Sequence, residues 1–119
     1  MRSRNQLNAR PDAKLAQAID GLWVRFLPEI QERVAIVEAA IQAVSERNLT
    51  EKQREATQAA GHKLAGVLGT FGLTRGTALA RELERAFARE SSPRADASAK
   101  LAEKAAELRN LIENRKPSS

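Results

Sequence analysis

The stretch PEIQERVAIVEAAIQAVSER, residues 28–47, carries the clearest helical pattern in the chain. Its apolar residues recur at alternating steps of four and three, at Ile30, Val34, Val37, Ile41 and Val44. That spacing forms one apolar stripe and is typical of a seam between packed helices. Pro28 lacks a backbone N–H and suits a first helical turn, where Glu29 and Glu32 complement the helix dipole. The sequence therefore predicts a long bundle helix that starts at Pro28.

Apolar stripes of helical period also lie on both sides of this stretch. Before it, Asp12 can cap a helix whose stripe is Leu15, Ile19, Leu22 and Phe26. After it, Thr50 and Gln53 form a capping box that starts a new helix. Gly72 is suited to a left-handed residue that ends this helix.

Two more helices complete the chain. One runs from about Thr74 to Glu90 and buries Leu79, Leu83, Ala86 and Phe87. Ser92 and Pro93 then fit the N-cap and first position of a last helix, which buries Leu101, Ala105, Leu108 and Ile112. Because the connections are short, successive helices are antiparallel neighbours. We therefore expect an all-α fold, an antiparallel up-down four-helix bundle with an additional short N-terminal helix packed at one end.

The composition limits the kind of protein this can be. A chain of 119 residues suits one domain, and its lack of cysteine excludes disulfides and thiolate metal sites. A single histidine excludes a multi-histidine metal site. No signal peptide or membrane span is visible, so we expect a cytoplasmic protein without membrane contact. We expect a monomeric bundle over residues 12–115, a flexible basic arm at 1–11 and a disordered tail at 116–119.

The net charge of +5 raises the alternative of a nucleic-acid-binding protein. Three positive charges, Arg2, Arg4 and Arg10, lie in the predicted arm, and the rest are spread over segments of mixed sign. No basic stripe lies beside exposed aromatic positions, as binding of single strands requires. We therefore expect no nucleic-acid partner.

His62, the only histidine, lies on the helix that ends at Gly72. Its neighbours on the same helix face are mostly small, namely Gln58, Ala59, Ala65, Gly66 and Gly69. Glycine inside a helix costs about 1 kcal/mol relative to alanine, so these glycines indicate a need for space. We interpret the five residues as a docking surface for a molecule that approaches the imidazole ring. The alternative is that the glycines serve helix packing alone and the histidine has no role.

A count along the following hairpin places a carboxylate level with the histidine. His62 lies eleven residues before Leu73, the centre of the turn, and Glu84 lies eleven residues after it. If Glu84 accepts a hydrogen bond from Nδ1, the tautomer is fixed and Nε2 keeps its lone pair as a nucleophile. Lys63 and Arg81 are cations that could neutralise an incoming anion. The alternative for each of these charged residues is an ordinary solvated side chain.

These residues resemble the histidine-containing phosphotransfer (HPt) domain of two-component phosphorelays. The family pattern has leucine, glycine and glycine at the second, fourth and tenth positions after the histidine, here Leu64, Gly66 and Gly72. Glu84 resembles the glutamate or glutamine that often bonds the histidine in this family. The resemblance covers the whole bundle in helix order.

Two positions near the histidine depart from the commonest family pattern. Many members place lysine three residues after the histidine, where this chain has Ala65. Its lysine is Lys63, which projects about 200° away around the helix. Gly61 stands where alanine is common.

The resemblance implies a phosphocarrier with His62 as the phosphoacceptor and Glu84 orienting its imidazole. The ring would take a phosphoryl group from a receiver-domain phospho-aspartate and pass it to another receiver. Implied partners are response-regulator receiver domains and a hybrid sensor histidine kinase, and the receiver would bring Mg²⁺. This chain has no P-loop and no cofactor of its own, so kinase activity is not expected. The alternative is a non-transferring interaction module that docks receiver or kinase domains.

Overall fold

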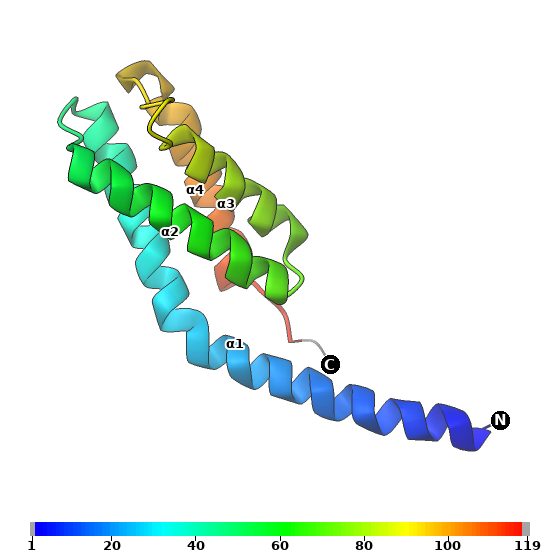
Figure 1. Cartoon of the computed structure of the whole chain (residues 1–119). Helices are drawn as coiled ribbons and strands as arrows, with labels where there is room; N and C mark the ends of the chain where they lie inside the picture. The colour runs from blue at the N-terminus through cyan, green and yellow to red at the C-terminus, as the bar shows by residue number, and fades with distance from the viewer. Residues whose placement is uncertain (1, 118–119) are drawn as a thin grey trace.

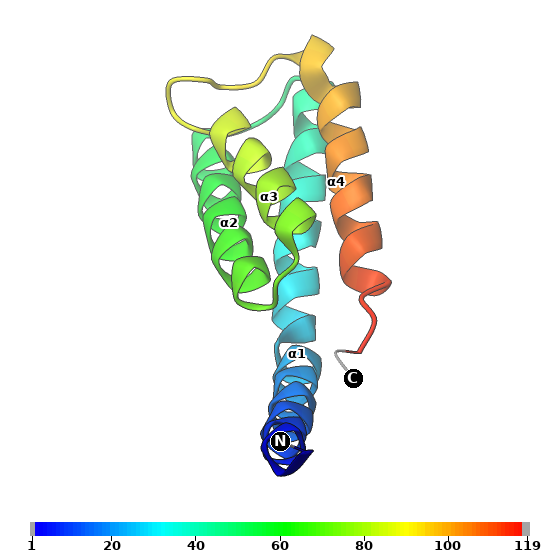
Figure 2. The same cartoon turned by 90° about the vertical axis from the view of Figure 1, so that its right-hand side faces the viewer.

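The computed structural model describes residues 2–117, and side chains from residue 13 onward. Within that range the helices follow in the order α1 (Arg2–Ser45), α2 (Glu51–Thr70), α3 (Thr74–Ala86) and α4 (Ser98–Glu113). A short 3₁₀ helix, η1 (Ala95–Ala97), precedes α4. Figures 1 and 2 show the C-terminal part of α1 bundled with the other three helices. The described chain contains no strand, and the predicted all-α bundle is confirmed.

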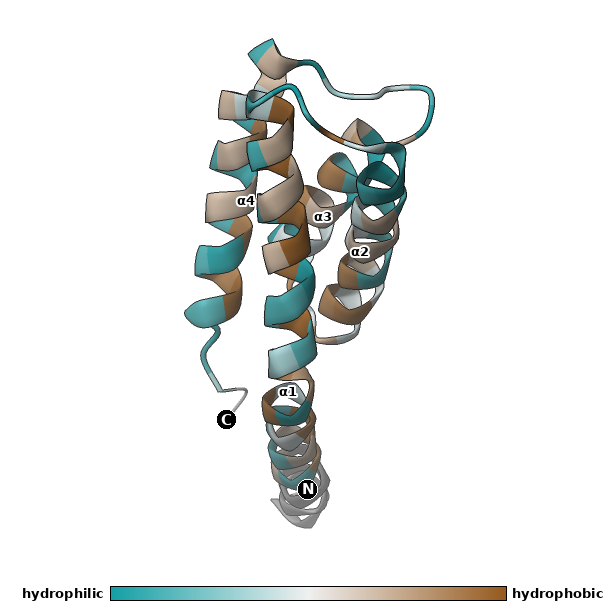
Figure 3. Cartoon of the chain, turned by 90° about the vertical axis from the view of Figure 1, so that its left-hand side faces the viewer, coloured by the Kyte–Doolittle hydropathy of each residue, from teal (hydrophilic) through white to brown (hydrophobic). Residues whose placement is uncertain are grey.

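The core is built from the predicted apolar stripes. The stripe of α1 from Ile30 to Val44 is buried along its length. Also buried are Leu79, Leu83 and Phe87 from α3 and its C-cap, and Leu101, Ala105, Leu108 and Ile112 from α4. Figure 3 shows hydrophobic residues along the inner sides of α1 and α4. Burial of one such aliphatic or aromatic side chain is worth about 1.5–3 kcal/mol, so this shared seam holds the bundle together.

The separate N-terminal helix predicted before Pro28 is wrong, because α1 runs continuously from Arg2 to Ser45. A proline inside a helix removes one backbone hydrogen bond and bends the axis rather than necessarily ending the helix. Figure 1 shows α1 bending partway, with its N-terminal part projecting beyond the bundle. The expected arm at 1–11 falls in this helix from residue 2 onward, and its side chains lie outside the described residues.

The expectation that the apolar stripe in the projecting part of α1 packs across one end of the bundle is wrong. Leu15, Leu22 and Phe26, three residues of its predicted stripe, are exposed. Its contacts with the bundle include buried Trp23 and the partly exposed Phe26, whose rings lie edge-on to Phe71 with centroids 5.2 and 6.3 Å away. The guanidinium of Arg115 lies 4.9 Å from the Trp23 ring centroid, which adds a cation–π contact.

The turn between α2 and α3 has the geometry predicted for Gly72. This glycine has a φ of 72°, in the left-handed region. Its N–H donates to the carbonyl of Gly69 at 3.1 Å, and the N–H of Leu73 donates to the carbonyl of Leu68 at 3.0 Å. These two bonds form a Schellman motif, which satisfies the last carbonyls of α2 and reverses the chain into α3.

The predicted start of the last helix at Ser92 and Pro93 is wrong. α3 already ends at Ala86, and α4 begins only at Ser98, after η1. Figure 2 shows the connection sweeping from the end of α3 to the start of α4, which lies further along the bundle. The chain between them must cover that distance, so Ser92 and Pro93 lie in an irregular segment. Of the predicted tail, residues 116–117 are non-helical, and 118–119 lie outside the described residues.

Candidate functional site

His62 stands on the surface of α2, and 74% of its side chain is exposed. Its Nδ1 lies 3.0 Å from Oε2 of Glu84 on α3, whose side chain is 24% exposed. This is the contact that the count along the hairpin predicted. The capping bond from the N–H of Gln53 to Oγ1 of Thr50, at 3.1 Å, starts α2 at the predicted place. The start of α2 and the turn at Gly72 together determine which residue of α3 lies opposite His62.

The contact fixes which nitrogen of the imidazole remains available. An ionised carboxylate only accepts hydrogen bonds, so Nδ1 of His62 carries the proton and donates it to Glu84. Nε2 then keeps its lone pair, and the ring is held by one edge. The arrangement is an oriented, exposed nitrogen nucleophile backed by a negative charge.

Gly61 allows α2 and α3 to approach at this level. It is buried, and a Cβ at this position would lie 3.1 Å from N, Cα and Cβ of Glu84. That distance is shorter than an ordinary van der Waals contact. The sequence alone does not reveal this role, since nothing in the residues around Gly61 shows that Glu84 packs against it.

A hollow of about 300 Å³ opens beside the imidazole. Its lining combines small, polar and charged side chains, namely Glu55, Gln58, Ala59, His62, Lys63 and Glu84. The structure therefore brings Gln58, Ala59 and Lys63 to the histidine, as predicted, and adds Glu55. The spacing of seven residues from Glu55 to His62, two helical turns, is the signal that could have found it.

The remaining predicted site residues lie outside this hollow. Gly66 and Gly69 are exposed further along α2, and Arg81 is exposed on α3. Ala65 was predicted to belong to the docking surface, and this is wrong, because it is only 3% exposed and packs in the core. It lies one helical turn after Gly61, which packs against Glu84 of α3. Helical spacing within α2 does not tell which of its sides another helix covers.

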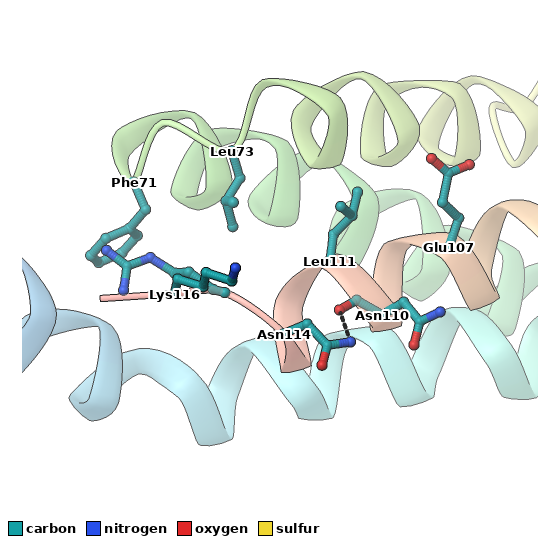
Figure 4. A pocket seen from close by; sticks show the side chains of 8 residues that line it. Phe71, Leu73, Glu107, Asn110, Leu111, Asn114 and Lys116 are labelled. Atoms are coloured by element: carbon teal, nitrogen blue, oxygen red, sulfur yellow. Dashed lines mark hydrogen bonds between the residues drawn. The ribbon is translucent and has the colours of Figure 1, made fainter. Parts of the chain in front are cut away.

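A larger hollow, of about 580 Å³, lies at the turn after α2 and the end of α4. Figure 4 shows Phe71 and Leu73 on one side of it and Asn110, Leu111 and Asn114 on the other. Neither His62 nor Glu84 lines this larger hollow, so it is separate from the hollow beside the imidazole. Among the described residues, no group of three or more His, Cys, Asp or Glu side chains could hold a metal ion. No helix there is both long and apolar enough to span a bilayer.

A helical bundle that presents one carboxylate-held histidine on an open surface has the arrangement that a phosphotransfer module would need. Comparison with known families agrees, since the Hpt domain family matches residues 21–116. The chain therefore belongs to the Hpt domain family. Hpt domains are phosphocarrier modules rather than kinases, and they work with receiver domains and kinases.

One similar curated protein is Protein RcaC of Microchaete diplosiphon. It is 37% identical over 62 residues, which cover 52% of this chain and 10% of RcaC. The chain thus spans about a tenth of the length of this relative. No solved structure gives a significant match to the chain.

Proposed function

We propose that His62 is the phosphoacceptor, which takes a phosphoryl group from the phospho-aspartate of one receiver domain and passes it to another. The observation that supports this most directly is the contact between Nδ1 of His62 and Glu84 at 3.0 Å on a ring that is 74% exposed. That geometry leaves Nε2 free to meet a partner's phosphoryl group.

The transfer step follows from this geometry. The lone pair of Nε2 attacks phosphorus, an N–P bond forms, and the P–O bond to the aspartate breaks. The electrons of that bond leave with the aspartate as a carboxylate. The ring of His62 becomes an N-phosphorylated imidazolium, whose positive charge lies beside the Glu84 carboxylate. Passing the group on reverses these bond changes, so no proton needs to be gained or lost.

The partner domain supplies what this chain lacks. The receiver would bring the Mg²⁺ that neutralises phosphoryl oxygens during transfer. Exposed small residues, Ala59, Gly66 and Gly69, let its active site approach the ring. Lys63 adds positive charge from within the hollow, and Arg81 is a weaker candidate for the same role. The phosphoryl group would originate on a hybrid sensor histidine kinase, and the chain would act in the cytoplasm as a monomer.

The test is transfer from a phosphorylated receiver to the purified chain. The wild type should acquire a label that is lost in acid and kept in base, and His62→Gln should acquire none. Persistent label in His62→Gln would contradict the proposal. A wild type that binds the receiver without taking label would indicate the non-transferring docking module instead.

A further inference from the structure

Arg54 is a charged side chain that the proposed mechanism does not use, yet it is only 5% exposed. It lies on α2, two turns before His62. Its Nε and Nη2 donate to the carboxylate of Glu51 at 2.8 and 3.0 Å. Its Nη1 donates to the carbonyl of Phe87, at the end of α3, at 2.6 Å and to Oε1 of Gln58 at 3.0 Å. One guanidinium therefore joins the end of α3 to a residue of the hollow.

This contact determines how the amide of Gln58 is turned. Arginine has only donors, so the Gln58 atom that faces it must be the oxygen. The amide nitrogen Nε2 is then left as a free donor, because it makes no hydrogen bond to another described residue. An amide that could otherwise rotate is thus held with its N–H groups turned away from Arg54.

Gln58 lies close to the position that a phosphoryl group would take. It is one helical turn before His62 and about 40° from it around the axis, whereas Lys63 is about 100° away. Helical side chains lean toward the N-terminus, so the ring of His62 extends over the turn that holds Gln58. Both side chains line the same hollow. The carboxylates there, Glu55 and Glu84, would repel phosphoryl oxygens, which leaves Gln58 and Lys63 as the donors.

We propose that Gln58 donates a hydrogen bond from Nε2 to an oxygen of the phosphoryl group on His62, and that Arg54 is the positioning residue that holds its amide. This inference rests on the proposed function. It assigns Gln58 a contact with the transferred group, where sequence reasoning placed it only on a docking surface.

The first test uses phosphoramidate, a small donor that phosphorylates histidine with loss of ammonia and needs no receiver. Gln58→Glu keeps an oxygen for Arg54 but puts a negative charge beside the phosphoryl group, so phosphorylation should slow by about tenfold or more. Gln53→Glu, the same change outside the hollow, should keep the wild-type rate. A wild-type rate in Gln58→Glu, or an equal loss in Gln53→Glu, would overturn the assignment. If phosphoramidate phosphorylates His62→Gln, or fails to phosphorylate the wild type, the proposed function itself is contradicted. This inference, which rests on it, then fails as well.

The second test separates positioning from simple support of the fold. Arg54→Lys removes the planar fork, so both the stability and the phosphorylation rate should fall. If Arg54 acts through Gln58, the rate effect should disappear when Gln58 is already alanine, while the stability effect persists. The ³¹P resonance of the phosphohistidine should shift in Gln58→Ala and in Arg54→Lys alike. Additive rate losses with an unmoved resonance would show that Arg54 only supports the fold.

Discussion

Gly61 on α2 lies directly against the backbone of Glu84 on α3, with less than the usual room for a Cβ. A Cβ at residue 61 would come within 3.1 Å of N, Cα and Cβ of Glu84. The two helices therefore lie close together one residue before His62. Because Glu84 is both the neighbour of Gly61 and the partner of His62, helix spacing and imidazole geometry depend on the same residue.

Gly61→Ala should therefore move α3 outward by a few tenths of an ångström and lengthen the contact between His62 and Glu84. We expect slower phosphorylation of His62 with little loss of helix content. The measurements are the transfer rate and the ¹⁵N resonances of the imidazole, which report the hydrogen bond at Nδ1. Gly21→Ala is the control, because nothing lies within 4 Å of its Cβ position. Unchanged imidazole resonances in Gly61→Ala would contradict this role.

Glu84→Ala should slow phosphoryl transfer without unfolding the bundle. Removing a carboxylate that orients a metal-bound imidazole costs about tenfold to hundredfold, and we expect a loss of that order here. The transfer rate of Glu84→Gln should lie between those of Glu84→Ala and the wild type, because an amide oxygen accepts the hydrogen bond but carries no charge. Glu82→Ala, on the same helix, removes the ion pair with Lys104 and should leave the rate intact. Equal rates for Glu84→Ala and Glu82→Ala would remove Glu84 from the mechanism.

Two glycines three residues apart should respond to alanine with opposite signs. Gly72 has a φ of 72°, so Gly72→Ala should lower the free energy of unfolding by about 1–2 kcal/mol. Gly69 is helical, and a Cβ there would lie at an ordinary 3.6 Å from Oγ1 of Thr77. Gly69→Ala should raise the free energy by about 0.5–1 kcal/mol. Urea unfolding measures both, and a destabilised Gly69→Ala would mean that Thr77 cannot adjust.

Acid should weaken the link between α3 and α4. Nε and Nη2 of Arg75 donate to Glu107 at 2.8 and 3.0 Å, and this hydrogen bonding lowers the pKa of the Glu107 carboxyl. A carboxyl with a lowered pKa stabilises the fold above its unfolded-state value, about 4.3, and loses that contribution as the pH falls through its folded-state value. In Glu107→Gln, the free energy of unfolding should therefore fall less between pH 7 and pH 3. Both residues are exposed, so the difference should be small and should shrink in high salt. An identical fall in both proteins would show that the pair does not contribute.

Local periodicity explains why much of the fold and site could be predicted. The stripe from Ile30 to Val44 is a property of neighbouring residues on one helix, and it is buried as expected. The pairing of His62 with Glu84 needed only the position of the turn and an equal rise per residue in both helices. Gly72 marked that turn through its conformational freedom.

Features that depend on how helices lie against each other could not be predicted in the same way. The helical arithmetic placed Ala65 near His62, but it could not tell that Ala65 is buried in the core. Pro28 can start a helix or bend one, and which of the two occurs depends on whether the residues before it are already helical. Arg54 reaches the Phe87 carbonyl across 33 residues, a contact that no local spacing reports.

The open hollow beside His62 fixes the order of the steps in the proposed transfer. Under the proposed function, one face of one ring must meet both the receiver that gives the phosphoryl group and the receiver that takes it. Two receivers cannot occupy that face together, so the first must dissociate before the second binds. Transfer should therefore follow ping-pong kinetics, and an excess of unphosphorylated donor receiver should compete with the acceptor.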